Sequence, residues 1–237
     1  SEVVGTRDGI ILYLIRHGLE NKLSFDIMEA VRKGKGVKPE WEEEMLKHDV
    51  PEWYITSCKK IKYMFPKAHA AAYVMSAIRL AWYKIYYPME FYAAYFTVAP
   101  GGFDGDIVMR GRGAVSATIE ELSKKPDATQ KEAETVTALS LAREALARGV
   151  VFLPVDLYKS DATAFLPENG KIRLPFAALG GLGEGAAQKI VEARADGEFF
   201  SIEELRERAK LNKSVIEILS QSGALKNLSE TNQYTFF

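Results

Sequence analysis

Lysine, histidine and tyrosine side chains gather on both sides of Pro66. Lys62 and Tyr63 precede this proline, and Lys67 and His69 follow it. Pro66 is well placed to open a helix, so Lys67 and His69 would lie in a first helical turn, where the helix dipole disfavours cations. An anion bound among these side chains and the free backbone N–H groups would offset that cost, and phosphate is the simplest such anion. A hydrogen-bonded structural histidine is the alternative interpretation of His69.

The segment 53–88 that contains these residues differs in charge from the rest of the chain. It holds six Lys or Arg residues and no Asp or Glu, in a chain of formal net charge −1. Aromatic residues are interleaved with these cations, which suits a polyanion that carries stackable rings. A helical hairpin with a solvated lysine face is the alternative. One helix is predicted from the residues that recur at helical spacing, namely Tyr54, Cys58, Ile61 and Phe65.

Length and composition set broad limits on the protein class. The 237 residues suffice for one large or two small domains, and 47% of them are hydrophobic, which is ample for a packed core. Residues 1–5 do not resemble a signal peptide, and no apolar run is long enough to span a bilayer, so no membrane is expected. The single cysteine, Cys58, excludes an intrachain disulfide and fits a reducing cytoplasm. The chain starts without Met, as a fragment would.

Arg7 is a further cation predicted to lie in a first helical turn. Thr6 is a suitable cap for a helix from about residue 7 to residue 17. Arginine binds phosphate oxygens through two parallel hydrogen bonds, so Arg7 is a candidate phosphate ligand. A surface arginine that pairs with a nearby carboxylate is an equally common alternative.

Asp104 and Asp106 form a carboxylate pair of the kind that nucleotidyl transferases use to hold magnesium ions. They lie, however, in a glycine-rich segment that has no flanking β-strand pattern to fix them. We interpret this segment as a linker or mobile loop and reject the pair as catalytic. Helices are predicted at 114–123 and 129–147, followed by a small β unit whose turn is Asn169-Gly170.

Glycines surround Leu182 in a pattern that resembles a helix-hairpin-helix motif. Gly181, Gly183 and Gly185 let the backbone turn tightly and approach a phosphate, while Leu182 anchors the turn in the core. The N–H groups at the start of the next helix would face a DNA strand, independently of base sequence. A glycine-rich turn between helices is the alternative. Glu184 departs from the pattern because it places a carboxylate near the phosphate.

A second hairpin without glycines is predicted after a helix at 202–208. Asn212 would cap the following helix, and Lys213 would lie in its first turn, again as a cation at a helix start. The two hairpins together would grip duplex DNA through backbone contacts.

The last residues carry an aromatic pattern. Gln233 is followed by Tyr234, Phe236 and Phe237, and exposed aromatic side chains are a liability unless they bind something. The pattern resembles the short peptide with which bacterial polymerases bind the sliding clamp. In that peptide the glutamine fixes the orientation and the apolar residues fill a pocket. Tyr234 and Phe236 stand where the common pattern has leucines.

The run from Lys62 to Tyr73 resembles the fingers region of bacterial family C replicative DNA polymerases of the PolC type. The run from Tyr86 to Phe96 continues the resemblance, which covers most of the chain and is weakest around 101–150. It implies a mainly α fold, in which a helical fingers domain is followed by a small α+β domain with tandem helix-hairpin-helix. The implied segments are fingers at 1–99, a linker with helices at 100–149, a β segment at 150–174, a duplex-binding module at 175–228 and a clamp-binding tail at 229–237.

The resemblance also implies partners and roles. Incoming dNTP would be bound through its triphosphate by Arg7, Lys67 and His69, in a pocket lined by Lys60, Lys62 and Tyr63. Primer–template DNA would contact Gly181, Gly183, Gly185 and Lys213, and the sliding clamp would bind Gln233, Tyr234, Phe236 and Phe237. The Mg²⁺ of the parent enzyme would be held by a palm domain outside this chain, so the chain alone should be inactive without the remaining polymerase domains.

Two other classes of protein remain open from the residues alone. The chain could be a non-enzymatic helix-hairpin-helix DNA-binding module in which the basic stretch is incidental. It could also be a helical interaction protein whose lysine-rich hairpin binds an acidic partner.

Overall fold

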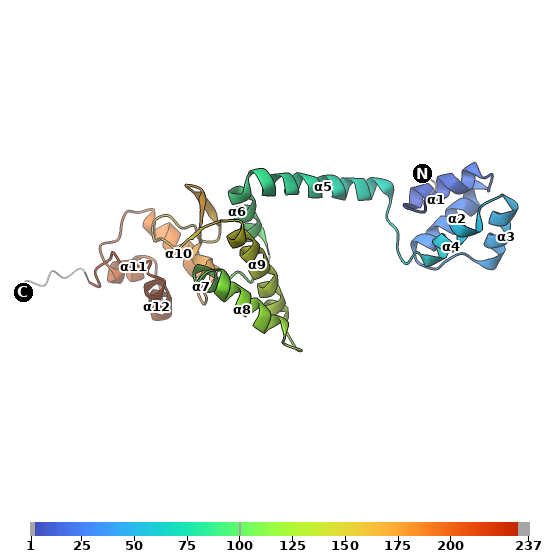
Figure 1. Cartoon of the computed structure of the whole chain (residues 1–237). Coiled ribbons are helices and arrows are strands. Elements are labelled where there is room, and N and C mark those ends of the chain that lie inside the picture. Colours follow the sequence, from blue (N-terminus) through green and yellow to red (C-terminus); the bar gives the residue numbers. More distant parts are fainter. Residues whose placement is uncertain (1–2, 100, 232–237) are drawn as a thin grey trace, which may run out of the picture. The chain divides into compact units, whose positions relative to one another are not determined.

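The computed structural model describes residues 3–99 and 101–231 of the chain (Figure 1). The described residues form twelve α-helices, one short 3-10 helix and one small three-stranded sheet, which confirms the expected mainly α class. The chain divides into two compact units, Ser1–Ala81 and Trp82–Phe237. The division falls inside the long helix α5 (Lys67–Tyr86), so the segment 1–99 that is predicted as one domain contributes to both units.

The first unit has a helical core built on amphipathic helices. Its buried residues include Ile10, Leu14, Val31, Met45 and Tyr54. Its helices before α5 are α1 (Arg7–Arg16), α2 (Asn21–Arg32), α3 (Pro39–Lys47) and α4 (Glu52–Lys60). Thr6 caps α1, as predicted, because its hydroxyl accepts the N–H of Gly9 at 3.2 Å.

Cys58 lies in the core of the first unit. Its thiol is fully buried on α4, and burial raises the pKa of this thiol to about 12. This confirms that Cys58 packs as a core residue.

The helix predicted through Phe65 is wrong in its second half. Helix α4 ends at Lys60, and Ile61 already has extended backbone angles. Met64 is buried instead of Phe65, whose ring is exposed, and the N–H of Met64 donates to the carbonyl of Arg32 at 3.2 Å. The helical conformation is also disfavoured for Phe65 because Pro66 follows it. Residues 61–66 therefore form an extended connector between α4 and α5.

The second unit combines helices with a small sheet. Its sheet has the order β1-β3-β2, and β1 runs parallel to β3. The strands are β1 (Phe152–Leu153), β2 (Leu166–Glu168) and β3 (Lys171–Arg173). The predicted turn is confirmed, since Asn169 and Gly170 both have positive φ and join the antiparallel strands β2 and β3.

Helices precede and follow this sheet in the sequence. Before it come α6 (Pro88–Val98), α7 (Gly105–Met109), α8 (Arg112–Ser123) and α9 (Gln130–Ala147). After it come η1 (Phe176–Ala178), α10 (Glu184–Arg194), α11 (Ile202–Arg208) and α12 (Lys213–Gln221). The core runs through all these elements, with Tyr92, Leu139, Phe176 and Ile190 among its largest buried side chains.

The glycine-rich segment that leads into α7 and includes its first residue, Gly105, is packed, which corrects its interpretation as a linker or mobile loop. A β-carbon on Gly105 would lie 2.7 Å from the carbonyl oxygen of Ala178, and one on Gly102 would lie 2.6 Å from the backbone of Glu134. These glycines thus serve close backbone approach rather than flexibility. The carboxylate of Asp104 accepts the N–H of Ile107 at 2.9 Å and caps α7, so it has a structural role.

Candidate nucleotide and DNA sites

The connector at 61–66 is held by the ends of two helices of the first unit. The N–H of Arg7, at the start of α1, donates to the carbonyl of Phe65 at 3.3 Å. The N–H of Lys67 donates to the Asp8 carboxylate at 2.7 Å. Because these bonds join the start of α1 to the start of α5, the structure brings Arg7 and Lys67 to one place. This is the juxtaposition that a shared phosphate ligand would need.

We predicted that the backbone N–H groups at the start of α5 are free, but Asp8 occupies one of them. The N–H of Lys67 is already paired with a carboxylate, which satisfies one orphan donor of the helix. The negative charge that the helix dipole favours here is therefore supplied by the chain itself. A triphosphate at this position would have to share the helix start with Asp8.

His69 belongs to an exposed row of rings. Its ring stacks on Phe65 with centroids 4.8 Å apart and an interplanar angle of 10°, and it lies 4.4 Å from the ring of Tyr73. Tyr63 extends the row with an edge contact to Phe65 at 4.9 Å. All four side chains are exposed. His69 is therefore packed among rings rather than fixed by a hydrogen bond in the described part of the chain, and the row offers faces for stacking.

The other predicted pocket residues flank this row. Lys60 ends α4 and Lys62 lies in the connector, and both are exposed. Tyr63 interacts with the guanidinium of Arg32, which also forms two 2.8 Å hydrogen bonds to Glu29. These bonds lower the pKa of the Glu29 carboxyl to about 2. Arg32 thus holds the connector through its carbonyl, which accepts the N–H of Met64.

The first hairpin, residues 179–183, adopts the predicted tight turn between η1 and α10. Gly181 has φ +85°, which a residue with a β-carbon rarely adopts, and Leu182 is buried with 4% exposure, which confirms it as the anchor. The N–H of Leu182 donates to the carbonyl of Leu179 at 3.1 Å. A β-carbon at Gly183 or Gly185 would meet no atom within 4 Å. The fold leaves this side of the hairpin open, as an approaching phosphate would need.

Lys131 is a functional candidate that the local sequence pattern does not indicate. A cavity of about 420 Å³ is lined by residues 177–183 of η1 and the first hairpin together with Lys131 and Thr135 of α9. Lys131 is exposed, and its ammonium has no ion-pair partner among the described residues. Only the fold reveals this neighbour, because α9 lies far from the hairpin in the sequence.

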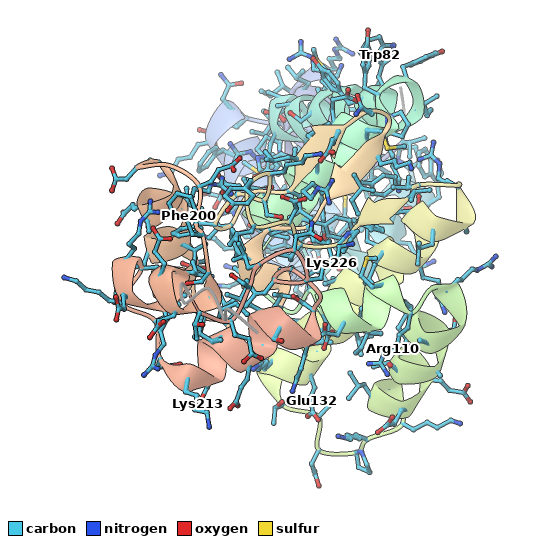
Figure 2. The ribbon with its side chains drawn as sticks, turned by 90° about the vertical axis from the view of Figure 1, so that its left-hand side faces the viewer. Trp82, Arg110, Glu132, Phe200, Lys213 and Lys226 are labelled. Atoms are coloured by element: carbon cyan, nitrogen blue, oxygen red, sulfur yellow. The ribbon has the colours of Figure 1, made fainter. Side chains whose placement is uncertain are left out.

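The second hairpin, residues 209–212, is formed between α11 and α12. Leu211 is 7% exposed, and Asn212 caps α12 through a 2.9 Å hydrogen bond from the N–H of Val215, which confirms the predicted cap. Lys213 is the first residue of α12 and lies at the surface (Figure 2), where its ammonium is 3.7 Å from the Glu217 carboxylate. The positive charge of Lys213 is therefore partly balanced by the Glu217 carboxylate on the same helix.

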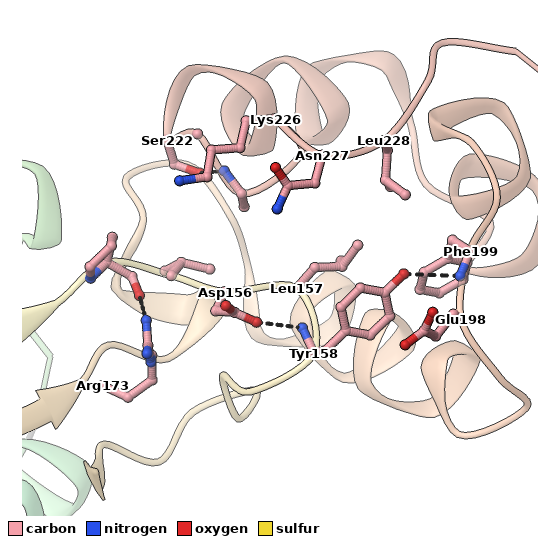
Figure 3. Close-up of a pocket in the computed structure, with 14 residues that line it drawn as sticks. Asp156, Leu157, Tyr158, Arg173, Glu198, Phe199, Ser222, Lys226, Asn227 and Leu228 are labelled. Carbon is pink, nitrogen blue, oxygen red and sulfur yellow. Dashed lines mark hydrogen bonds between the residues drawn. The ribbon is translucent and has the colours of Figure 1, made fainter. Parts of the chain in front are cut away.

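A larger cavity of about 470 Å³ lies between the β segment and the end of α12 (Figure 3). Its polar groups are mostly bonded to the protein. Asp156 accepts the N–H of Tyr158 at 2.9 Å, and the Tyr158 hydroxyl accepts the N–H of Phe199 at 3.0 Å. Arg173 donates to the carbonyl of Pro154 at 2.8 Å and pairs with Glu168. The bond from Phe199 to Tyr158 joins the β segment to the loop before α11, and the other bonds lie within the β segment, so these polar groups have structural roles.

Three further predictions concern the clamp, a metal ion and a membrane. The residues that we predict to bind the clamp, Gln233, Tyr234, Phe236 and Phe237, lie outside the described residues. Within the described residues, no group of three or more His, Cys, Asp or Glu side chains is arranged to hold a metal ion. No helix in the described ranges is long and apolar enough to cross a membrane.

Both hairpins of the second unit lie within the match to one protein-family model. Residues 149–234 match the family model described as "Helix-hairpin-helix motif", a range that includes both hairpins and the small sheet.

Comparison with known proteins extends the match to the whole chain. The chain is 54% identical over 238 aligned residues to the DNA polymerase III PolC-type of Halalkalibacterium halodurans and 51% identical to that of Bacillus subtilis. The corresponding protein of Thermotoga maritima is 48% identical. Each alignment covers 100% of this chain and 17% of the relative. The chain is thus similar, over all its length, to one region of PolC-type DNA polymerase III and spans about 17% of the length of these relatives.

Proposed function

We propose that this chain is the part of a PolC-type replicative DNA polymerase that binds the incoming dNTP, the primer–template duplex and the sliding clamp. The observation that carries the proposal is the identity of about 50% to such polymerases over the whole chain. In this proposal the chain acts in the bacterial cytoplasm, together with the remaining polymerase domains.

The nucleotide part of the proposal rests on the start of α5. Arg7, Lys67 and His69 bind the triphosphate, because two cations and an imidazole meet where the α1 and α5 starts are bonded together. Lys60, Lys62 and Tyr63 line the pocket, and the exposed rings beside His69 stack on the base.

Removing a positive charge and removing a negative charge at this site are expected to have opposite effects on nucleotide binding. Lys67→Ala removes a charge-assisted contact and is expected to weaken dATP binding roughly tenfold. Asp8→Asn keeps a capping side chain but removes the competing negative charge, so dATP binding is expected to tighten. An NMR titration that follows the His69 imidazole signals of the chain measures both. If both variants bind dATP as the wild type does, the triphosphate does not bind at the start of α5.

The duplex part rests on the two hairpins. Gly181, Gly183, Gly185 and Lys213 contact the DNA backbone, and Lys131 lies beside the first hairpin as a further cation. Such contacts do not depend on base sequence, which suits a polymerase that must copy any template. The clamp is bound by Gln233, Tyr234, Phe236 and Phe237.

We propose that magnesium is held elsewhere in the complete enzyme, because no group of three or more His, Cys, Asp or Glu side chains among the described residues is arranged to hold a metal ion. The sequence has one Asp-Gly-Asp run, at 104–106. The carboxylate of its first residue, Asp104, accepts the N–H of Ile107 and caps a helix. We assign the catalytic carboxylates to the palm of the complete enzyme.

A primer–template titration tests the duplex part. Fluorescence anisotropy of a labelled duplex is expected to show binding that tightens as salt falls, with a slope of log K against log salt of about −0.9 for each phosphate that a lysine or arginine neutralises. We expect a slope of about −2 or steeper, because Lys131 and Lys213 each neutralise a phosphate. Binding that is independent of salt, or no binding at low salt, would favour the protein-interaction class over the DNA-binding classes.

A further inference from the structure

The two hairpins repeat one backbone pattern. In each, a residue with positive φ is followed by a buried leucine and then by the cap of a helix. The first hairpin has Gly181 at φ +85° and the second has Lys210 at φ +48°. Lys210 therefore occupies the position in the second hairpin that glycine occupies in the first.

The two hairpins differ in charge at this pattern. The first hairpin has no side chain at Gly181 and a carboxylate at Glu184, the first residue of α10. The second hairpin has Lys210 at its tip and Lys213 as the first residue of α12. The first hairpin thus presents backbone and a negative charge, whereas the second presents two ammonium groups.

Lys210 is the more available of the two lysines. Its backbone N–H donates to the carbonyl of Glu207 at 3.2 Å, but its exposed side chain has no ion pair or hydrogen bond among the described residues. Lys213 is placed 3.7 Å from the Glu217 carboxylate. An anion that approaches the hairpin tip would therefore meet the Lys210 ammonium without displacing an existing partner.

We propose that Lys210 binds a phosphate of the DNA duplex and supplies by charge what the first hairpin supplies by its glycine backbone. This inference rests on the proposed duplex binding and assigns to it a residue that the sequence pattern, with its missing glycines, obscures. The compact ammonium on a flexible chain follows the phosphate backbone rather than the base edges, so the contact is independent of sequence.

The positive φ of Lys210 allows an unusually clean test. Lys210→Asn removes the charge but places a residue type that adopts this backbone conformation readily, so the hairpin keeps its shape without gaining the glycine backbone of the first hairpin. The expected result is a duplex affinity roughly five- to tenfold weaker at 0.1 M salt and a salt slope shallower by about 0.9. The melting temperature is expected not to fall. Lys210→Arg keeps the charge and is expected to bind the duplex nearly as the wild type does.

The matched control is Lys124→Ala, which changes the net charge by the same amount. Lys124 caps α8 and pairs with Glu120 at 2.6 Å. Anisotropy titrations of a labelled primer–template with all four proteins, over a range of salt, compare them directly. Wild-type affinity and slope in Lys210→Asn, or equal losses in Lys210→Asn and Lys124→Ala, would overturn the assignment of Lys210 while leaving duplex binding intact. If the wild type itself shows no salt-dependent binding, the proposed duplex binding fails as well.

Discussion

Gly34→Ala is expected to destabilise the first unit by about 3 kcal/mol, which is a large loss for a small helical core. Gly34 follows α2 at φ +72°, where alanine costs about 1 kcal/mol in backbone strain. A β-carbon would in addition collide with the carbonyl oxygen of Lys62, which belongs to the backbone of the connector. Backbone can yield only if the connector moves away from α2, which would also break the hydrogen bond from Met64 to Arg32.

Hydrogen exchange followed by mass spectrometry measures this loss, because it reports the first unit separately from the second. The matched control is Gly36→Ala. Gly36 also has φ +72°, but a β-carbon there would meet nothing within 4 Å, so only the strain of about 1 kcal/mol is expected. Equal protection losses in the two variants would show that the contact with Lys62 contributes nothing.

Gly105→Ala is expected to destabilise the second unit by about 2 kcal/mol and to weaken duplex binding. The added carbon would lie 2.7 Å from the Ala178 carbonyl and 3.2 Å from the Leu174 side chain. Ala178 ends η1, directly before the first hairpin, so the hairpin must shift if the loop is to make room. Urea unfolding gives the stability loss, and the primer–template titration gives the loss of affinity.

Gly113→Ala is the control for this substitution. Gly113 lies in α8, and a β-carbon there would meet nothing within 4 Å. Alanine at that position is expected to stabilise the helix by about 0.5–1 kcal/mol with no change in duplex affinity. A Gly105→Ala chain as stable as the wild type would contradict the close approach between the loop and η1.

The sequence predicts those features that depend on short-range signals. The Thr6 and Asn212 caps, the Asn169-Gly170 turn and the buried Leu182 follow from local chemistry and are all present. The predicted helix through Phe65 fails because helical spacing alone cannot show that Arg32, from another helix, draws Met64 into the core. Local pattern and tertiary bonding compete there, and tertiary bonding prevails.

The glycine-rich segment shows the same limitation. Closely spaced glycines predict a flexible backbone when the residues that pack against them are unknown. Gly102 packs against Glu134 and Gly105 against Ala178, and both partners are distant in the sequence. Asp8 and Lys131 are missed for the same reason. Each acts on a predicted site from another helix, Asp8 by a hydrogen bond to Lys67 and Lys131 by lining the cavity at the first hairpin.

The burial of Cys58 has a consequence for chemical labelling. The chain has one thiol, it is fully buried in the first unit, and its pKa of about 12 leaves almost no thiolate at neutral pH. Alkylating reagents react with the thiolate, so modification at neutral pH requires the core around α4 to open. The rate of alkylation therefore reports the opening of the first unit alone, without an engineered cysteine and without a signal from the hairpins.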